Sequence, residues 1–134
     1  MDSHVINVDT STRKFVDLTP ELTAFAEGRG DGLLSVFAPH STVGLAILEL
    51  GSESDADLEA ALERLLPRDD HLYKHAHGST GHGADHLIPA LISPSLTVPV
   101  IAGRPTLGTW QSVVLVDLNT DNPHRQVRLS FLPA

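Results

Sequence analysis

Histidine is concentrated in one short segment of this chain. Five of the eight histidines lie within residues 71–87, at His71, His75, His77, His82 and His86. Because the chain has no cysteine, imidazole and carboxylate groups are its only strong metal ligands. Zinc-type catalytic sites commonly use three protein ligands and leave one position open. The segment therefore predicts a site for a divalent metal ion, with a solvated loop that carries incidental histidines as the alternative.

The spacing of these histidines indicates which of them could act together. His71 and His75, and likewise His82 and His86, are four residues apart and would share one face of a helix. Glycines at positions 78, 81 and 83 argue against a continuous helix, so only His86 is expected on regular helix. If the segment is extended instead, His75 and His77 share a face. More than three histidines are available, and their spacing leaves the ligand set open.

A second group of polar residues lies between two apolar runs, residues 33–37 and 43–50. His40, Ser41 and Thr42 stand where a loop between buried strands can present side chains to a cleft. The two hydroxyl residues suit phosphate oxygens, and His40 could bind the metal or act in catalysis. Glu49 falls inside the second apolar run, where a carboxylate needs a partner such as a metal, an arginine or a histidine. The alternatives are a plain turn, a histidine hydrogen-bonded at the edge of the core, and a glutamate that faces solvent.

Residues 103–111, with the sequence GRPTLGTWQ, contain the third group of candidates. Arg104 follows a glycine and could form a two-pronged contact with a phosphate. Trp110, the only tryptophan, could stack on a flat heterocycle while Gln111 binds its polar edge. A surface arginine and a core tryptophan are the alternatives. A serine hydrolase built on Ser41 and His40 is disfavoured, because the chain contains no Gly-x-Ser-x-Gly segment.

The elements that must position these groups follow from hydrophobic periodicity. Apolar runs predict strands over residues 4–8, 14–18, 32–38, 43–50, 96–100, 109–118 and 125–132. Helices are expected from Pro20 to just before Gly28, from Ser54 to just before Pro67, and from an Asp85 cap through Leu91. The pattern predicts a single compact α+β domain with about seven or eight strands, in a mostly antiparallel or mixed sheet, and three short helices. The histidine segment is then a loop that leads into the third helix.

Composition restricts the partners of the chain. Its 134 residues fit one domain, and 41% apolar residues without a long apolar run describe a soluble globule that spans no membrane. The first residues lack the basic and apolar pattern of an export signal, so a cytoplasmic protein is expected. A formal net charge of −8 would repel nucleic acid and anionic membrane surfaces. A small phosphorylated molecule would therefore have to meet a local basic group such as Arg104.

Two segments resemble a known family. Residues 93–111, SPSLTVPVIAGRPTLGTWQ, and residues 38–49, APHSTVGLAILE, resemble motifs of the YjbQ family, also called the UPF0047 or secondary thiamine-phosphate synthase family. The resemblance implies an α+β domain that assembles as a homotrimer, with sites near the subunit boundaries. It also implies a polar site that contains His40, His75 and His86, with Thr42, Glu49, Arg104, Trp110 and Gln111 near it. Leu48 and His82 depart from the family pattern, which usually has Asn at the first position and Asn or Asp at the second.

The resemblance also implies a reaction. A metal-binding enzyme of this family would act on a small phosphorylated heterocycle and join a pyrimidine diphosphate to a thiazole phosphate with release of diphosphate. Metal ligation is assigned to His40, His75 and His86, catalysis to Glu49 and His40, and substrate binding to Ser41, Thr42, Arg104, Trp110 and Gln111. Three imidazoles favour Zn²⁺, whereas a diphosphate usually employs Mg²⁺, so a metal-assisted hydrolysis fits the ligands equally well. A non-enzymatic trimer that binds metal and small anions is the alternative.

Overall fold

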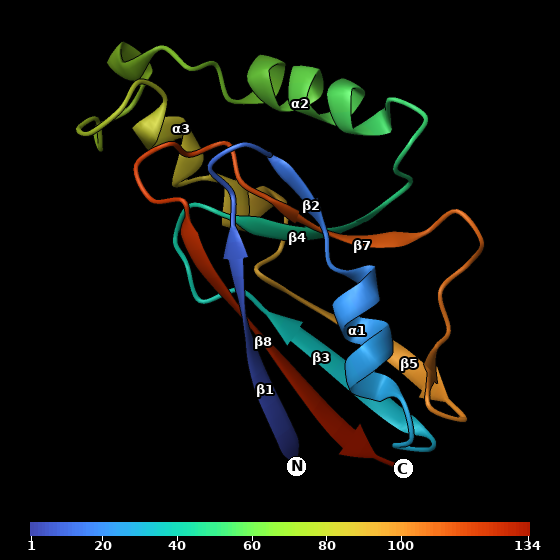
Figure 1. Cartoon of the computed structure of the whole chain (residues 1–134). Helices are drawn as coiled ribbons and strands as arrows, with labels where there is room; N and C mark the ends of the chain where they lie inside the picture. Colours follow the sequence, from blue (N-terminus) through green and yellow to red (C-terminus); the bar gives the residue numbers. More distant parts are fainter.

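The computed structural model describes residues 1–134, and its eight strands form two antiparallel sheets (Figure 1). The larger sheet has the order β1-β8-β3-β5-β6, and the smaller sheet has the order β2-β7-β4. The predicted α+β class and strand number are confirmed. The larger sheet consists of β1 (Asp2–Asp9), β8 (His124–Pro133), β3 (Gly32–Phe37), β5 (Ser95–Ile101) and β6 (Arg104–Pro105), and the smaller of β2 (Phe15–Asp17), β7 (Ser112–Val116) and β4 (Gly44–Leu48).

Short helices connect the strands. They are α1 (Thr19–Ala26), α2 (Ser54–Leu65), the 3-10 helix η1 (Asp70–Leu72), α3 (His82–Asp85) and α4 (Ile88–Leu91). Figure 1 shows α2 lying across the smaller sheet, and the chain from the end of α2 to α3 gathered at one end of the molecule. No helix has the length and apolar character needed to span a bilayer.

The main core lies between the two sheets and depends on alternating strand residues. Val127, Leu129 and Phe131 of β8 point inward, while the residues between them face outward, as the pattern predicts. β7 is buried on both faces, because Val113 and Leu115 join this core and Val114 and Val116 pack in a second cluster with Leu62 of α2. This explains the continuous apolar run predicted as a strand over residues 109–118, although the strand itself is shorter and begins at Ser112.

The predicted helix from an Asp85 cap through Leu91 is wrong in its start and in its continuity. Helical residues begin at His82, and two one-turn helices replace the single one. The interruption has a physical cause, because the ring of Pro89 would clash with the carbonyl of Asp85 four residues earlier in an unbroken helix. Asp85 caps nothing, since it is the last residue of α3 and its side chain is fully buried.

The outer face of the larger sheet carries large apolar side chains. Leu33, Phe37, Ile101 and Leu132 are between 44% and 56% exposed. Leu33 lies opposite Leu132 in the antiparallel register, and Ile101 lies opposite Arg104, so these residues share one face. β3 was predicted to be buried on both faces, but within one chain only the face of Leu34 and Val36 lies in the core.

Candidate metal centre

Three histidines converge at the end of the molecule that carries α3. His75, His82 and His86 each offer one ring nitrogen, and these nitrogens all lie within 4.8 Å of one another. The Nε2 atom of His82 lies 3.0 Å from Nε2 of His75 and 3.0 Å from Nε2 of His86. Three nitrogens that bind one Zn²⁺ tetrahedrally at about 2.0–2.1 Å are separated by about 3.3 Å, so the spacing is close to that of a metal site.

The hydrogen-bonding capacity of imidazole supports the same interpretation. The Nε2 atom of a neutral imidazole has a single lone pair and cannot accept well from two N–H donors at once. His82 Nε2 nevertheless has two ring nitrogens at 3.0 Å. One ion that takes the lone pairs of all three rings resolves this conflict. The donor set therefore fits a divalent metal of the zinc type.

Glycine at position 83 brings His75 to the other two histidines. His82 and His86 are one helical turn apart, and the backbone N–H of His86 donates to the carbonyl of His82 at 3.2 Å. A Cβ atom on Gly83 would lie 2.5 Å from the carbonyl oxygen of His75 and 2.6 Å from Cβ of Tyr73. The backbone of residues 73–75 therefore packs directly on α3, which only a residue without a side chain permits.

Asp121, in the turn between β7 and β8, holds the third ring. His82 Nδ1 lies 2.6 Å from Oδ2 of Asp121, and Oδ1 of Asp121 accepts a hydrogen bond from the backbone N–H of Ser79 at 3.0 Å. The hydrogen bonds from His82 and then Ser79 lower the pKa of Asp121 to about 2. Because an ionised carboxylate only accepts hydrogen bonds, this contact favours the neutral tautomer of His82 that has its proton on Nδ1 and its lone pair on Nε2.

A buried ion pair fixes α3 beneath the histidines. Arg68 donates to both carboxylate oxygens of Asp85, at 2.5 and 3.1 Å, and this contact raises the pKa of Arg68. Asn119 donates to Asp85 at 3.1 Å and so ties the β7–β8 turn to the same carboxylate. A Cβ atom on Gly81 would clash with the guanidinium of Arg68, so this glycine makes room for the ion pair.

The protonation of His86 favours metal binding. Burial lowers the pKa of His86, and the neighbouring histidines lower it further. The ring is therefore neutral at physiological pH and has a lone pair to offer. His77 lies beside the set, with its ring centroid 4.4 Å from that of His75 and 4.5 Å from that of His82, but it is exposed and outside the group of converging nitrogens.

His40 lies outside this group, although the predicted ligands were His40, His75 and His86. The structure brings His75 and His86 together with His82 instead. Nε2 of His40 accepts a hydrogen bond from the backbone N–H of Gln126 at 2.9 Å, and burial, then the charge of Arg125, lowers the pKa of His40. His40 lines a separate cleft together with Asn7, Val8, Asp9, His124, Arg125 and Gln126.

The other candidates around β4 are also separated. Thr42 is buried, and its hydroxyl accepts a hydrogen bond from Arg125 at 2.9 Å, so within this chain it stabilises the core. Ser41 is exposed in the turn before β4, whereas Glu49 follows the last residue of β4 and is half-buried. The segment after β4 leads to the start of α2, on the opposite side of the molecule from α3 (Figure 1).

The predicted substrate-binding residues of the third group lie away from the histidines. Arg104 is exposed in β6, and Trp110 is 73% exposed in the loop between β6 and β7. Gln111 accepts a hydrogen bond from the backbone N–H of Gly108 at 2.8 Å, which closes this loop. In Figure 1 the β5–β6 hairpin and the loop that follows it lie at the opposite end of the molecule from α3. The roles assigned to these residues stay predictions.

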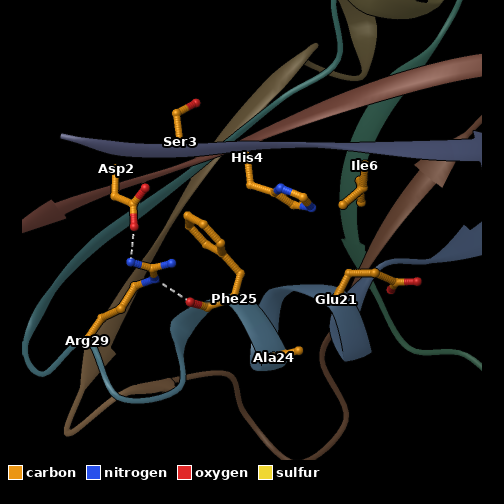
Figure 2. A pocket seen from close by; sticks show the side chains of 8 residues that line it. All are labelled: Asp2, Ser3, His4, Ile6, Glu21, Ala24, Phe25 and Arg29. Carbon is orange, nitrogen blue, oxygen red and sulfur yellow. Dashed lines mark hydrogen bonds and ion pairs between the residues drawn. The ribbon is translucent and has the colours of Figure 1, made fainter.

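A second hollow lies between β1 and α1, and Figure 2 shows His4 and Phe25 facing each other across it. Two of the three charged residues that line it are paired with each other. Arg29 forms an ion pair with Asp2, and its guanidinium lies 4.2 Å from the ring centroid of Phe25. The hollow therefore offers fewer free polar groups than the histidine centre, which remains the better candidate for a functional site.

Comparison with known proteins identifies the family. The family model described as UPF0047 protein YjbQ-like matches residues 4–134. This chain belongs to the YjbQ family. UPF0047 protein Rv2556c of Mycobacterium tuberculosis is 62% identical to this YjbQ-family chain over 132 residues, which cover 98% of each chain. A UPF0047 protein of Methanothermobacter thermautotrophicus is 38% identical and covers 90% of this chain, with 85% of its own length matched.

Solved structures of YjbQ-like proteins have the same fold. The hypothetical protein APE1520 from Aeropyrum pernix K1 superposes with a TM-score of 0.86 at 28% identity, and the match covers both chains completely. The conserved hypothetical protein TT1486 from Thermus thermophilus gives a TM-score of 0.83 at 31% identity and covers 96% of this chain and 99% of its own. The names of these relatives state no reaction, so the function of this YjbQ-family chain has to be inferred from its site.

Sequence reasoning identified two of the three converging histidines as ligands and noted His82 as a departure from the family pattern. It missed the residues that orient them, namely Arg68, Asn119 and Asp121, and it gave Asp85 another role. Asn119 and Asp121 lie between the predicted strands 109–118 and 125–132, where no motif marks a functional residue. No local signal indicates that Asp121 meets a histidine 39 positions earlier in the chain.

Proposed function

We propose that this protein is a divalent-metal-dependent enzyme that acts on a small phosphorylated heterocycle, with hydrolysis as its reaction. The observation that carries this conclusion is the meeting of three imidazole nitrogens within 4.8 Å. One of these rings is held by a carboxylate, which is the usual arrangement around metal-bound histidines. Imidazole ligands favour Zn²⁺ and related ions, whereas Mg²⁺ prefers oxygen ligands.

A divalent ion would supply Lewis acidity that neutralises charge on phosphoryl oxygens. The residues of the chain hold the ion and move protons. His75, His82 and His86 are the ligands, and the exposed His77, 4.4 Å from His75 between ring centroids, is placed to transfer a proton at the rim of the site. Glu49 was the predicted catalytic acid or base, but the segment that carries it lies on the other side of the molecule, so His77 takes this role within one chain (Figure 1).

Ser79 adds polar groups beside the carboxylate of Asp121. The hydroxyl of Ser79 is the one buried side-chain polar atom of the protein without a hydrogen-bond partner. Ser79 also donates its backbone N–H to Asp121, which holds His82. The same side chain nevertheless contributes to the lowered pKa of Asp121, so the hydroxyl lies close to this carboxylate and adds to the polar surroundings of His82.

The protein works as a homotrimer in which a neighbouring copy supplies the substrate-binding residues. The β5–β6 hairpin and the following loop, which carry Arg104 and Trp110, lie at the opposite end of the molecule from α3 (Figure 1). These two residues could therefore reach a histidine centre only on another copy. The exposed apolar face of the larger sheet supports this assembly, because Leu33, Ile101 and Leu132 are each about half exposed in one chain. Arg104 lies on the same face, opposite Ile101.

One other reaction and one binding function without turnover are the alternative outcomes of the same test. Transfer of a pyrimidine diphosphate to a thiazole phosphate needs the same recognition of phosphate, but its leaving group is usually neutralised by Mg²⁺ bound to oxygen ligands. A non-enzymatic trimer would bind metal and anions without turnover. The product distinguishes the three functions. Hydrolysis releases free phosphate or diphosphate and leaves the heterocycle unchanged, the transfer reaction forms thiamine phosphate, and the binding protein forms no product.

The test begins with metal content and continues with turnover. The purified protein is expected to retain about one Zn²⁺ or a similar ion per chain, because three imidazoles form a complete ligand set. The variants His82→Ala and His86→Ala should lose the metal, whereas the control His71→Ala, which alters a histidine outside the set, should keep it. Metal-loaded protein is then incubated with a panel of phosphorylated heterocycles, and phosphate release is measured. Equal metal content in all variants would overturn the metal centre, and bound metal without any turnover would favour the binding protein.

A further inference from the structure

Asp121 reaches the histidine centre from the turn between β7 and β8, and we propose that it is the positioning residue that keeps His82 ready to bind the metal. This inference rests on the proposed metal binding at the same site. Oδ2 of Asp121 lies 2.6 Å from Nδ1 of His82. A ligand imidazole whose second nitrogen donates to a carboxylate keeps one tautomer and one orientation, and it becomes a more basic ligand.

The two carboxylate oxygens have different tasks. Oδ1 accepts from the backbone N–H of Ser79 at 3.0 Å, whereas Oδ2 accepts from His82 and, at 3.4 Å, from the side-chain amide of Asn119. Asparagine has the same shape but only one acceptor oxygen, and its amide nitrogen is a donor. In Asp121→Asn the side chain can serve Ser79 or His82, but not both. When it serves Ser79, its NH₂ group faces Nδ1, and the proton of His82 must move to Nε2, where it blocks the lone pair.

A purely structural role for Asp121 would predict a different outcome. The turn has anchors that do not use this carboxylate, because Asn119 donates its side-chain amide to Asp85 at 3.1 Å and its backbone N–H to Asp117 at 3.0 Å. The backbone N–H of Asp121 donates to Asn119 at 2.9 Å, a contact that any residue at position 121 retains. The turn should therefore survive the substitution, and the effect should fall on His82.

The neighbouring backbone packs closely against one side of the pair. Gly78 has a φ angle of +81°, and a Cβ atom on it would lie 2.8 Å from Oδ2 of Asp121 and 3.0 Å from Nδ1 of His82. The chain thus passes over the carboxylate and the ring at contact distance. With this side of the pair closed, the identity of the atom at Oδ2 bears directly on the tautomer of the ring.

The first measurement is the affinity for Zn²⁺ by competition with a chelator at pH 8. Loss of an outer partner of a metal-bound histidine typically weakens binding about 10–100-fold, and we expect this loss for Asp121→Asn. The control is Asp69→Asn, because Asp69 also accepts a backbone N–H, that of His71, but touches no ring of the centre. The control should bind like the wild type. Wild-type affinity in Asp121→Asn would overturn the positioning role.

The second measurement needs no metal. Long-range ¹H–¹⁵N NMR spectra at pH 8 report which nitrogen of His82 carries the proton, and we expect Nδ1 in the wild type and a shift towards Nε2 in Asp121→Asn. A proton on Nε2 in the wild type would refute the inference even if the variant failed to fold. If the wild type binds no Zn²⁺ but has the expected tautomer, the proposed function fails while Asp121 still positions the ring. If Zn²⁺ binds but the variant changes neither affinity nor tautomer, only the role of Asp121 fails.

Discussion

Replacement of Asp85 by asparagine should destabilise the protein strongly, because it leaves the charge of Arg68 without its partner. Asp85 is fully buried and accepts three hydrogen bonds, two from Arg68 and one from Asn119. Breaking a buried ion pair by removing one partner typically costs about 3–5 kcal/mol. Arg68 keeps weaker contacts to the carbonyls of Thr80 and Leu118, at 3.1 and 3.4 Å, and its side chain is 24% exposed, so the low end of that range, about 3 kcal/mol, is expected.

Thermal unfolding of the metal-free protein converts this energy into a measurable shift. With an unfolding entropy of about 2.1 cal/mol/K per residue, a loss of about 3 kcal/mol lowers the Tm of a chain of this length by about 10 °C. Glu59→Gln is the matched control, because Glu59 pairs with Lys14 on the surface and such a pair contributes less than about 1 kcal/mol. A shift for Asp85→Asn no larger than that of the control would refute the claim that this ion pair anchors α3.

Three further predictions concern the segment beneath the site, pH and assembly. Gly83→Ala should lower the free energy of unfolding by about 1–3 kcal/mol through overpacking, because the new methyl group would meet the His75 carbonyl at 2.5 Å. Urea unfolding measures this loss, and the affinity for Zn²⁺ should fall as well. An unchanged unfolding free energy and an unchanged affinity would mean that the backbone of residues 73–75 moves away freely. Burial depresses the pKa of His40 below 6.5, so its contribution to stability is present above that pH and is lost as the pH falls through the folded-state pKa. His40→Gln should therefore flatten the decline in unfolding free energy between pH 7 and 5, and an equally steep decline would contradict this. Ile101→Asp should dissociate the proposed trimer in sedimentation experiments, and a monomeric wild type at micromolar concentration would remove the basis for assembly.

The sequence predicts the elements that depend on local patterns. The helix from Ser54 follows from apolar residues at helical spacing, and it ends at Leu65, two residues before Pro67. The alternation along residues 125–132 predicts β8 and its inward face correctly. Thr42 is different, because its interpretation as a phosphate ligand ignored Arg125, a residue 83 positions later that uses the hydroxyl in the core. Contacts between segments distant in sequence have no counterpart in a periodic pattern.

In the candidate site, too, local patterns could be predicted and contacts between distant segments could not. The density of histidine and glycine drew attention to residues 71–87, and His75 and His86 of this segment do converge with a third histidine. The third ring could not be chosen from spacing, because the choice depends on the turn that brings Asp121 to His82 and on the close packing of Gly83 against Tyr73. Both contacts join residues whose own neighbours in the sequence give no indication of the pairing.

Buried charges beneath the histidines explain how a glycine-rich segment can hold three rings in one arrangement. Glycine lowers the cost of unusual backbone angles but also increases the conformational entropy that must be lost on folding. Here the backbone directly before His82 is held by two contacts, since Gly81 donates its N–H to Asp70 at 3.0 Å and Arg68 donates to the carbonyl of Thr80 at 3.1 Å. Arg68 itself is fixed by Asp85, so the ion pair restrains the same turn that carries His82. The ring of His82 therefore projects from a backbone that the core-facing charges hold in place.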